Sequence, residues 1–425
     1  MSSLQSLPPA LLTRVPGPRS IDLAERLAAV EGRNVTCLEP VAPIFWQRAQ
    51  GANVWDVDGN RYVDLTAAFG VANTGHGHPS VIAAVAEQAE NLLHGMGDVH
   101  PSAVKVELLE TLVRRFPGGG SARAVLSSSG SDAVETAIKT AYLATGKAGI
   151  VAFEGGYHGL GLGALDATAR RDFREPFDLR LAHATAFAHF GDAGDVRRAA
   201  DDCSEPVGAV IVEAIQGRGG ERIPPDGFLA ELRSLCDAEG WLLIVDEIFT
   251  GFGRTGRWFA CEHDRVVPDL ICLGKGMSSG MPISACVGRR EVMDAWPISR
   301  GEAIHTQTFL GHPPGCAAAL AAIQVIEDEK LVERAASNGI AALARLQERL
   351  HGRDGIVEVR GRGLVLAIEC DTKKRAADAC ARALSGGVIA LLSGDDGRVV
   401  SLTPPLCIER EILHQAIDIV ADALS

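Results

Sequence analysis

The sequence predicts an α/β protein in which a large domain has a mostly parallel sheet with helices on both faces, beside a smaller α+β domain. Two features predict this architecture. Short apolar runs alternate with helical periodicity between residues 75 and 320, and the pattern changes after about residue 320. The chain has 425 residues, of which 47% are hydrophobic and 22% charged, which is typical of a folded protein of two or three domains.

Residues 1–74 are expected to form an N-terminal segment that joins the smaller domain. Apolar residues at helical spacing predict a helix over 21–30, and Asp58-Gly59 between two apolar runs predicts a hairpin over 53–66. Residues 75–320 are expected to form the large domain. Its buried apolar runs predict strands at 124–126, 149–153, 209–212, 242–245 and 270–273. Its helical stretches are expected at 81–93, 103–116, 132–144 and 227–238.

Residues 321–425 are expected to form the smaller, C-terminal domain. A long helical region leads into it and two short strands follow. The predicted helices lie at 317–328, 331–350 and 412–424, and the predicted strands at 356–360 and 364–368.

Composition excludes several classes of function. The 41 basic and 54 acidic residues give a net charge of −13, with no basic stripe, so nucleic acid is not expected as a partner. No apolar run is long enough to span a bilayer, and no secretory signal is recognised, so we expect a cytoplasmic protein without membrane contact. Ten scattered cysteines, with no CxxC pair and no histidine cluster, predict core thiols and no metal site.

Two charged side chains follow predicted strands of the large domain. Asp246 ends the apolar run at 242–245, where a carboxylate is expensive to bury unless a cationic partner meets it. Lys275 follows the run at 270–273 between two glycines, where burial would lower its pKa and leave an amine that can attack a carbonyl. Taken alone, Asp246 fits a structural salt bridge, and Lys275 fits a turn on the surface equally well.

Two further segments lie at strand ends. In SSSGSDAVETAIK the free N–H groups of a helix starting near Asp132, with Gly130 and Ser131, can cradle a phosphate. Simple capping by Ser131 or Asp132 explains the same residues. In GGYHG, Tyr157 and His158 lie on a loop, where an aromatic ring either stacks on a flat ligand or packs on its own domain.

The set points to one cofactor. Four features are expected at one sheet edge: a phosphate cradle, an aromatic ring, a carboxylate and a nucleophilic lysine. Each of them suits one chemical group of pyridoxal 5′-phosphate (PLP). At this point the chain resembles the class-III aminotransferases of the fold-type-I PLP enzymes, along nearly its whole length. The motifs are VWDVDGNRYVDL (54–65), GHGHP (75–79), SGSDAVETAIK (129–139), GGYHG (155–159), VEAIQGRGG (212–220), VDEIFTGFGRTG (245–256), LGKGM (273–277), HTQTFLGHP (305–313), VRGRGL (359–364) and TPPLCI (403–408).

The resemblance implies a role for each matching residue. Lys275 would hold PLP as a Schiff base and act as general base, and Asp246 would pair with the pyridine nitrogen. The other residues implied at the cofactor are Gly130 and Ser131 at the phosphate, Tyr157 and Ile248 on the two ring faces, His158 and Glu213 near the ring, and Thr308, which would reach the phosphate of the neighbouring subunit. This predicts a homodimer with active sites at its interface. Substrate contacts are expected from Phe69, Leu160, Gln216 and Ser401.

Three positions depart from the family pattern. Leu160 stands where 4-aminobutyrate aminotransferases have an arginine, and Ser401 stands where a second carboxylate-binding arginine is usual. Phe249 replaces a frequent glutamine near the cofactor. A carboxylate binds best to a guanidinium, so we expect a less common substrate, such as an ω-amine or an amino sugar. Other arginines could substitute, namely Arg171, Arg218 or Arg362.

The resemblance therefore implies an aminotransferase. It would move an amino group between an amine donor (ω-amine, amino acid or amino sugar) and a carbonyl acceptor by ping-pong kinetics. The alternative in the same family is a racemase, epimerase or aminomutase that uses the same Lys275. A pseudoenzyme is disfavoured by the intact Lys275 and Asp246, and an NAD-dependent oxidoreductase by the absence of a glycine-rich fingerprint.

Overall fold

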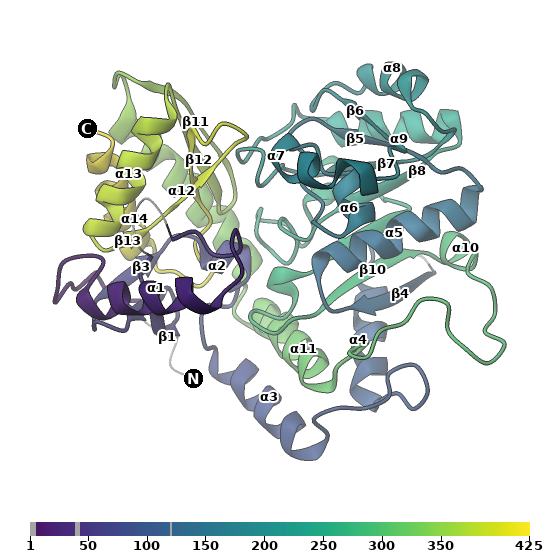
Figure 1. Cartoon of the computed structure of the whole chain (residues 1–425), viewed down its shortest axis with the longest axis horizontal. Helices are drawn as coiled ribbons and strands as arrows, with labels where there is room; N and C mark the ends of the chain where they lie inside the picture. The colour runs from purple at the N-terminus through teal and green to yellow at the C-terminus, as the bar shows by residue number, and fades with distance from the viewer. Residues whose placement is uncertain (1–5, 39–42, 120) are drawn as a thin grey trace.

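The computed structural model describes residues 6–38, 43–119 and 121–425. Its largest sheet has seven strands in the order β4-β10-β9-β8-β7-β5-β6 (Figure 1). Only β10 runs antiparallel to its neighbours, which confirms the mostly parallel sheet predicted from the sequence. The strands are β4 (Ala122–Ser127), β5 (Gly149–Phe153), β6 (Thr185–Ala188), β7 (Val207–Glu213), β8 (Leu242–Asp246), β9 (Leu270–Leu273) and β10 (Ser284–Arg289).

Both faces of this sheet are buried under helices. Along β5, Ile150 and Ala152 belong to one apolar cluster, while Val151 and Phe153 belong to another. The first cluster includes helix α5 (Gly130–Thr145), and the second includes helix α9 (Phe228–Glu239). Because side chains alternate along a strand, a run that is apolar at every position must be covered on both sides. Helices α4 (Ala103–Arg114), α8 (Asp195–Asp202) and α10 (Arg290–Met293) also pack on this sheet.

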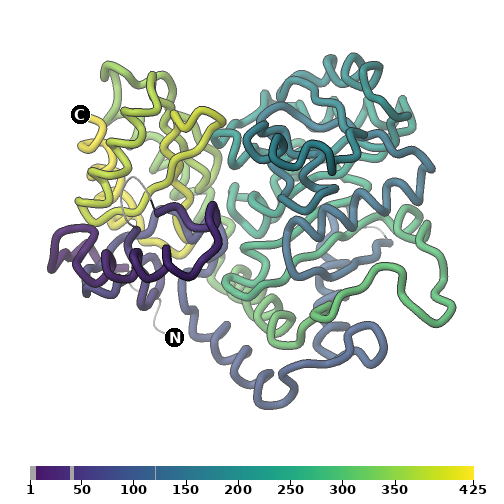
Figure 2. Tube along the Cα trace, viewed as in Figure 1, coloured from purple at the N-terminus to yellow at the C-terminus, as the bar shows by residue number. Residues whose placement is uncertain are grey.

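The smaller part of the molecule contains two four-stranded sheets. One is antiparallel, in the order β11-β12-β15-β14, and the other has the order β1-β2-β3-β13. Because β13 pairs in parallel with β3, the N-terminal segment and the C-terminal region share a sheet, and they lie together in Figures 1 and 2. The strands are β1 (Trp46–Gln50), β2 (Asn53–Asp56), β3 (Arg61–Asp64), β11 (Ile356–Arg362), β12 (Val365–Cys370), β13 (Val388–Ile389), β14 (Leu391–Ser393) and β15 (Val399–Leu402).

Helices cover these sheets and connect them to the large one. Helix α11 (Pro313–Asp328) packs on α3 (Pro79–Asn91) and α4, and α12 (Leu331–Leu350) continues into the smaller part (Figure 1). The other helices there are α1 (Pro18–Val30), α13 (Lys373–Ser385) and α14 (Arg410–Ala423). The short helices are α2 (Ala67–Gly70), α6 (Leu162–Asp166), α7 (Arg171–Arg174), η1 (Glu175–Arg180), η2 (Ala260–Asp264) and η3 (Lys275–Met277). Among the described residues, none of the helices has the length and apolarity needed to cross a bilayer.

Every element expected from periodicity is present, and β5, β9 and α12 have the expected ends. The elements that the sequence did not predict are the strands β1, β6, β10, β13, β14 and β15, the helices α8 and α13, and the short helices α2, α6, α7, α10, η1, η2 and η3. Helix α13 was missed because its apolar face consists mainly of alanines such as Ala376, Ala379 and Ala383, which give a weak periodic signal.

Candidate functional site

A cavity of about 560 Å³ opens where strands of the large sheet end against the smaller part of the molecule. Glu213 ends β7, Asp246 ends β8, and Lys275 follows β9, so three neighbouring strands deliver charged groups to one place. The opposite wall comes from β14 and β15. The lining contains most residues expected from the sequence: Phe69, Gly130, Ser131, Tyr157, His158, Leu160, Glu213, Asp246, Ile248, Phe249, Lys275 and Ser401.

Asp246 has a buried histidine as its cationic partner. The Nδ1 of His158 lies 2.8 Å from Oδ2 of Asp246, and Oδ1 accepts a hydrogen bond of 3.0 Å from the N–H of Ile248. Burial acts to lower the pKa of His158, but the hydrogen bond and charge of Asp246 outweigh it and raise that pKa overall. The two contacts fix the carboxylate, which retains capacity to accept a further donor from the cavity.

Lys275 occupies strained backbone at the end of β9. Its φ of +44° lies in the left-handed region, which non-glycine residues adopt mainly where the surroundings enforce it. Its Nζ lies 4.9 Å from the centre of the Phe249 ring. Burial lowers the pKa of the Lys275 amine, although the negative charges of Asp246 and Glu213 oppose the shift. A larger fraction of neutral amine makes this lysine a better nucleophile.

The start of α5 forms an anion-binding turn. The helix begins at Gly130, and its cap is Ser129, whose Oγ accepts from the N–H of Asp132 at 3.3 Å. The helix thus begins two residues before the expected start near Asp132, and its cap is Ser129, not Ser131 or Asp132 as expected. With Ser129 as cap, the N–H groups of Gly130 and Ser131 lie in the first turn without partners in the helix. Such a turn binds phosphate through its N–H groups and the helix dipole.

Glycines let the backbone come close around this turn. A Cβ on Gly130 would lie 2.9 Å from Cδ1 of Ile248, and one on Gly159 would lie 2.6 Å from Oγ of Ser131. The Oγ of Ser131 itself accepts from the N–H of Gly161 at 2.9 Å. The loop that follows β5 is therefore held against the start of α5, and side chains larger than hydrogen do not fit between them.

Glu213 holds the loop that carries Tyr157. Its two oxygens accept from the N–H groups of Tyr157 at 2.9 Å and Gly217 at 3.1 Å. Burial raises the pKa of Glu213 to about 7. The Tyr157 ring meets Phe173 edge-on at 5.8 Å between centroids, and the guanidinium of Arg218 lies 4.9 Å from its centre. The ring at the cavity is thus fixed in place from several sides.

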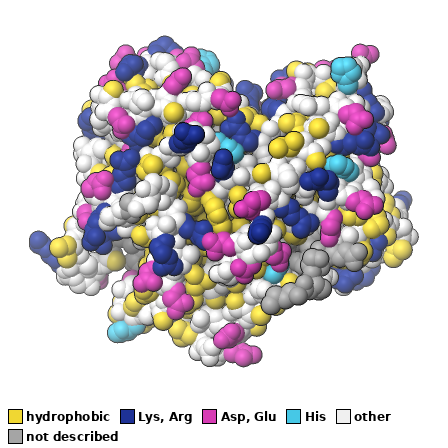
Figure 3. All heavy atoms as spheres, turned by 180° about the vertical axis from the view of Figure 1, so that it is seen from behind, with side chains coloured by type: hydrophobic (Ala, Val, Ile, Leu, Met, Phe, Trp, Pro, Cys, Tyr) yellow, Lys and Arg dark blue, Asp and Glu magenta, His cyan; other side chains and the backbone are white. Residues whose placement is uncertain are grey.

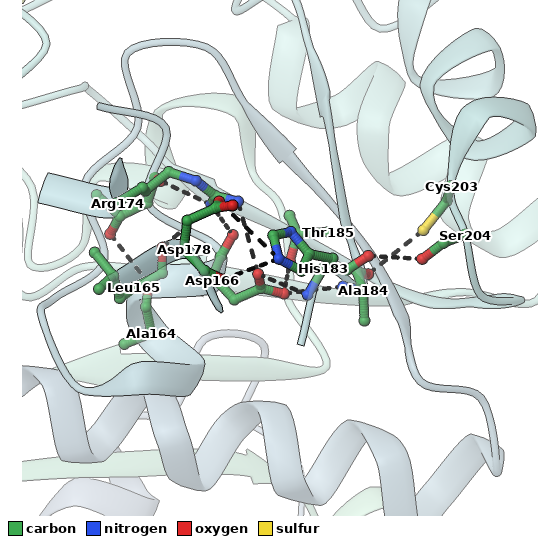
Figure 4. Close-up of polar contacts among 11 residues, drawn as sticks. Ala164, Leu165, Asp166, Arg174, Asp178, His183, Ala184, Thr185, Cys203 and Ser204 are labelled. Carbon is green, nitrogen blue, oxygen red and sulfur yellow. Dashed lines mark hydrogen bonds and ion pairs between the residues drawn. The ribbon is translucent and has the colours of Figure 1, made fainter. Parts of the chain in front are cut away.

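A buried carboxylate, Asp166, anchors the outer wall of the cavity. It accepts hydrogen bonds of 3.1 Å from the N–H groups of His183 and Ala184 and from the Thr185 hydroxyl (Figure 4). The Arg174 guanidinium donates to the Leu165 carbonyl at 3.2 Å. These contacts tie α6 and α7 to the start of β6. Leu160 and Arg170, which flank this segment, both line the cavity.

Two positions that depart from the family pattern differ in what they contribute to the cavity. Ser401 donates a hydrogen bond of 2.6 Å to Oε1 of Glu221, a residue that the sequence analysis did not single out. Leu160 is exposed and contributes no charge. Of the three arginines considered as substitutes, only Arg218 lines the cavity, since Arg171 faces Glu175 and Arg362 faces Asp226. Sequence reasoning also missed Arg170, because no motif marks its position.

Two predicted residues lie outside the cavity lining. The amide of Gln216 donates to the Glu154 carbonyl at 2.7 Å and is buried beside the loop at Gly155. Thr308 is exposed in the segment after β10. Among the described residues, no group of His, Cys, Asp and Glu has a geometry that could hold a metal ion.

The donor set fits PLP. The first turn of α5 suits a phosphate, the carboxylate of Asp246 suits a protonated ring nitrogen, and the amine of Lys275 suits an aldehyde. Tyr157 and Ile248 offer flat and apolar surfaces for an aromatic ring. The phosphate, the ring nitrogen, the aldehyde and the two ring faces of the cofactor therefore have matching residues around one cavity.

Comparisons with known proteins agree with this chemistry. The family model for class-III aminotransferases matches residues 37–424. An acetylornithine aminotransferase of Methanopyrus kandleri is 42% identical and covers 90% of this chain and 94% of its own. A 4-aminobutyrate aminotransferase of Mycobacterium leprae is 38% identical over 97% of each chain.

A solved structure shows the same fold. The ornithine aminotransferase of Toxoplasma gondii, whose active site is partially occupied by PLP, superposes with a TM-score of 0.87 at 32% identity. The match covers 95% of this chain and 94% of that one. The chain is a PLP-dependent aminotransferase and belongs to the class-III aminotransferase family.

Proposed function

We propose that this enzyme transfers amino groups at the cavity between the two parts of the molecule, with Lys275 as the residue that attaches PLP and moves the proton. The observation that carries this proposal is the convergence of Lys275, Asp246 and the first turn of α5 on one cavity. Bound PLP supplies an aromatic ring that accepts the electron pair released when a C–H bond of the substrate breaks.

The residues around the cavity divide this work. Gly130 and Ser131 bind the phosphate and so fix one end of the cofactor. Asp246, oriented by His158, keeps a negative charge at the ring nitrogen, where it stabilises the bound proton. Tyr157 and Ile248 enclose the ring and keep water from it.

Lys275 has two functions in the proposal. Its neutral Nζ forms the covalent attachment to the cofactor aldehyde, which the burial-lowered pKa of the amine favours. With an amine substrate bound, the same Nζ would act as the base that takes the proton from the substrate carbon carrying the amine and would hold it for return, while PLP would supply the electron-accepting ring. Donor and acceptor use the same cavity in turn, so the kinetics are ping-pong.

The substrate is proposed to be an ω-amine or a related amine. The relatives are named for acetylornithine and 4-aminobutyrate, and 4-aminobutyrate carries its amine at the end of a chain. Leu160 and Ser401 are neutral, so these positions lack the guanidinium groups that would bind a substrate carboxylate. Small-molecule amines and carbonyl compounds are therefore the proposed partners of the site.

We propose that the enzyme is a homodimer. Figure 3 shows the face opposite to that of Figure 1, where hydrophobic side chains reach the surface across the middle and lower part, among charged ones. Large apolar side chains are exposed in two segments, at Leu92, Leu93, Met96, Val99, Ile304 and Phe309. The rings of His94 and Phe309 lie 5.2 Å apart, so the two segments are adjacent. Exposed apolar side chains gathered in adjacent segments indicate an interface, and Thr308 precedes Phe309 in the chain.

We also propose that the enzyme works in the cytoplasm. The cysteines within the fold, such as Cys236, Cys272 and Cys286, are buried thiols. Buried reduced thiols are typical of proteins in a reducing compartment.

The proposal is tested by absorbance spectra of the wild type and Lys275→Ala with PLP and an amine alone. The wild type is expected to lose the absorbance of the lysine-bound cofactor and release one equivalent of carbonyl product. Lys275→Ala is expected to lose turnover on the order of 10³-fold, because it lacks the proton carrier. The exposed Lys147→Ala serves as the matched control. A racemase or mutase would instead return to the starting spectrum, and an unchanged Lys275→Ala would contradict the proposal.

A further inference from the structure

Glu221 lines the substrate cavity and has a buried carboxylate oxygen without a hydrogen-bond partner. The residue is 3% exposed, has a φ of +47°, and lies in the loop between β7 and α9. Oε1 accepts the hydrogen bond of 2.6 Å from Ser401, whereas Oε2 is buried and has no hydrogen-bond partner. An unpaired buried carboxylate oxygen is strongly unfavourable, so its retention in a cavity indicates a ligand that satisfies it.

Neighbouring side chains do not donate a hydrogen bond to Oε2 of Glu221, because their donor groups bind other acceptors. The guanidinium of Arg360 donates to Glu369 at 2.7 Å and to backbone carbonyls at Gly220 and Glu221. The hydroxyl of Ser393 donates to the Gly217 carbonyl at 3.2 Å and lies close enough to the Glu221 carboxylate to lower the pKa of that group. The protein therefore supports the Glu221 backbone firmly and leaves Oε2 for something that enters the cavity.

Glu221 and Lys275 line the same cavity, and Phe249 lies next to both Lys275 and the loop that carries Glu221. The Nζ of Lys275 lies 4.9 Å from the centre of the Phe249 ring. A Cβ on Gly217 would lie 3.0 Å from Cδ1 of that ring, and the Gly217 carbonyl accepts from the Glu221 N–H at 3.1 Å. Because one cavity contains both residues, a chain molecule bound there can contact Lys275 at one end and Glu221 at the other.

We propose that Glu221 binds a second, protonated amino group of the substrate, which makes α,ω-diamines the preferred amine donors. This inference rests on the proposed aminotransferase function and specifies its substrate class. An ammonium group donates to Oε2 and also supplies the positive charge that a buried carboxylate lacks. A carboxylate at the same place would be repelled by Glu221, in contrast to its attraction by an arginine at position 401.

The first test compares α,ω-diaminoalkanes with 1-aminoalkanes of equal chain length in the amine half-reaction. We expect the ratio of kcat/KM values to favour the diamine about 10- to 100-fold at the best length, the range of a hydrogen bond to a buried charge. Glu221→Gln keeps the size and can still accept from Ser401 but loses the charge, so the ratio is expected to fall to about one. The exposed Glu231→Gln is the matched control, and its ratio should equal that of the wild type.

The second test measures binding without turnover. Calorimetry on Lys275→Ala protein with PLP is expected to give a dissociation constant for the diamine at least tenfold below that of the monoamine. Adding Glu221→Gln should remove this difference. This readout separates recognition at Glu221 from the chemistry at Lys275.

The outcomes distinguish the two proposals. If the wild type reacts with both amine classes equally, or if the preference survives Glu221→Gln, the role of Glu221 is wrong while the aminotransferase assignment stands. If amino alcohols of equal length give the same kcat/KM as the diamines, the site recognises a hydroxyl group and the cationic assignment is wrong. If no amine reacts with the wild-type holoenzyme, the proposed function fails, and this inference fails with it.

Discussion

The imidazole of His158 and the carboxylate of Asp246 lie 2.8 Å apart and are both buried, although 88 residues separate them in the sequence. The loop after β5 and the end of β8 thus supply a charge pair next to the position proposed for the cofactor ring. A buried carboxylate without such a partner would be costly, so the histidine stabilises the form of Asp246 that the chemistry requires.

Replacing His158 is expected to weaken the cofactor site. In His158→Gln, the charged partner of Asp246 is lost, and about 2 kcal/mol of charge-assisted hydrogen bonding goes with it. The dissociation constant for PLP, measured by fluorescence titration, should rise roughly 30-fold. The matched control is His189→Gln, because His189 also bonds an aspartate, Asp195, but is exposed. Equal PLP affinity in the wild type and His158→Gln would contradict the proposed role.

Whether the sequence could predict a feature of this site depends on how far apart in the chain the contacting residues lie. Lys275 and Asp246 are predictable because strand ends of a parallel sheet meet at one edge, so local patterns suffice. The pairing of Asp246 with His158 depends on which loop covers which strand, and only the fold supplies that. Glu221 has no motif, since its role arises from Ser401, 180 positions away.

The preference for diamines is expected to increase with pH. Burial raises the pKa of Glu221 to about 7, although hydrogen bonding by Ser401 and Ser393 and the charge of Arg360 on β11 act to lower it. Glu213 on β7 is the other charged group that affects it, and it raises the pKa. The carboxyl is neutral below this value and ionised above it, and only the ionised form attracts an ammonium group. The diamine-to-monoamine ratio of kcat/KM should therefore rise severalfold from pH 6 to pH 8.

This ratio isolates Glu221 from the other titrating groups. Lys275 and the reacting amine affect both substrates alike, so their ionisation cancels in the ratio. Glu221→Gln should give a flat profile because the amide does not titrate. A ratio that falls as pH rises would mean that the protonated carboxyl is the form that binds, which would contradict the cationic assignment.

The buried Asp166 is expected to contribute strongly to stability. Asp166→Ala removes the buried acceptor of the N–H groups of His183 and Ala184 and breaks the link between α6 and the start of β6. The free energy of unfolding, measured by denaturant titration, should fall by about 3 kcal/mol. KM should also rise, because Leu160 and Arg170, which lie on either side of α6 in the chain, line the cavity.

A nearby exposed aspartate provides the control for Asp166. The side chain of Asp178 is 59% exposed, and its carboxylate lies 4.0 Å from the His183 ring. Asp178→Ala should change the free energy of unfolding by less than about 0.5 kcal/mol, since exposed pairs contribute little. Comparable losses in the two variants would show that burial of Asp166 does not stabilise this wall.

The exposed apolar segments predict a dimer that a single charge should weaken. Phe309 is 58% exposed beside His94, so Phe309→Glu would place an unpaired carboxylate in the proposed interface. The dissociation constant of the dimer, measured by sedimentation velocity, should rise at least about 30-fold, as expected for about 2 kcal/mol or more. PLP affinity should fall in parallel, since the adjacent Thr308 is proposed to reach the partner's cofactor. Leu179→Glu, at a residue that is 98% exposed on η1, should change neither value. A wild-type enzyme that sediments as an active monomer at micromolar concentration would refute the shared site.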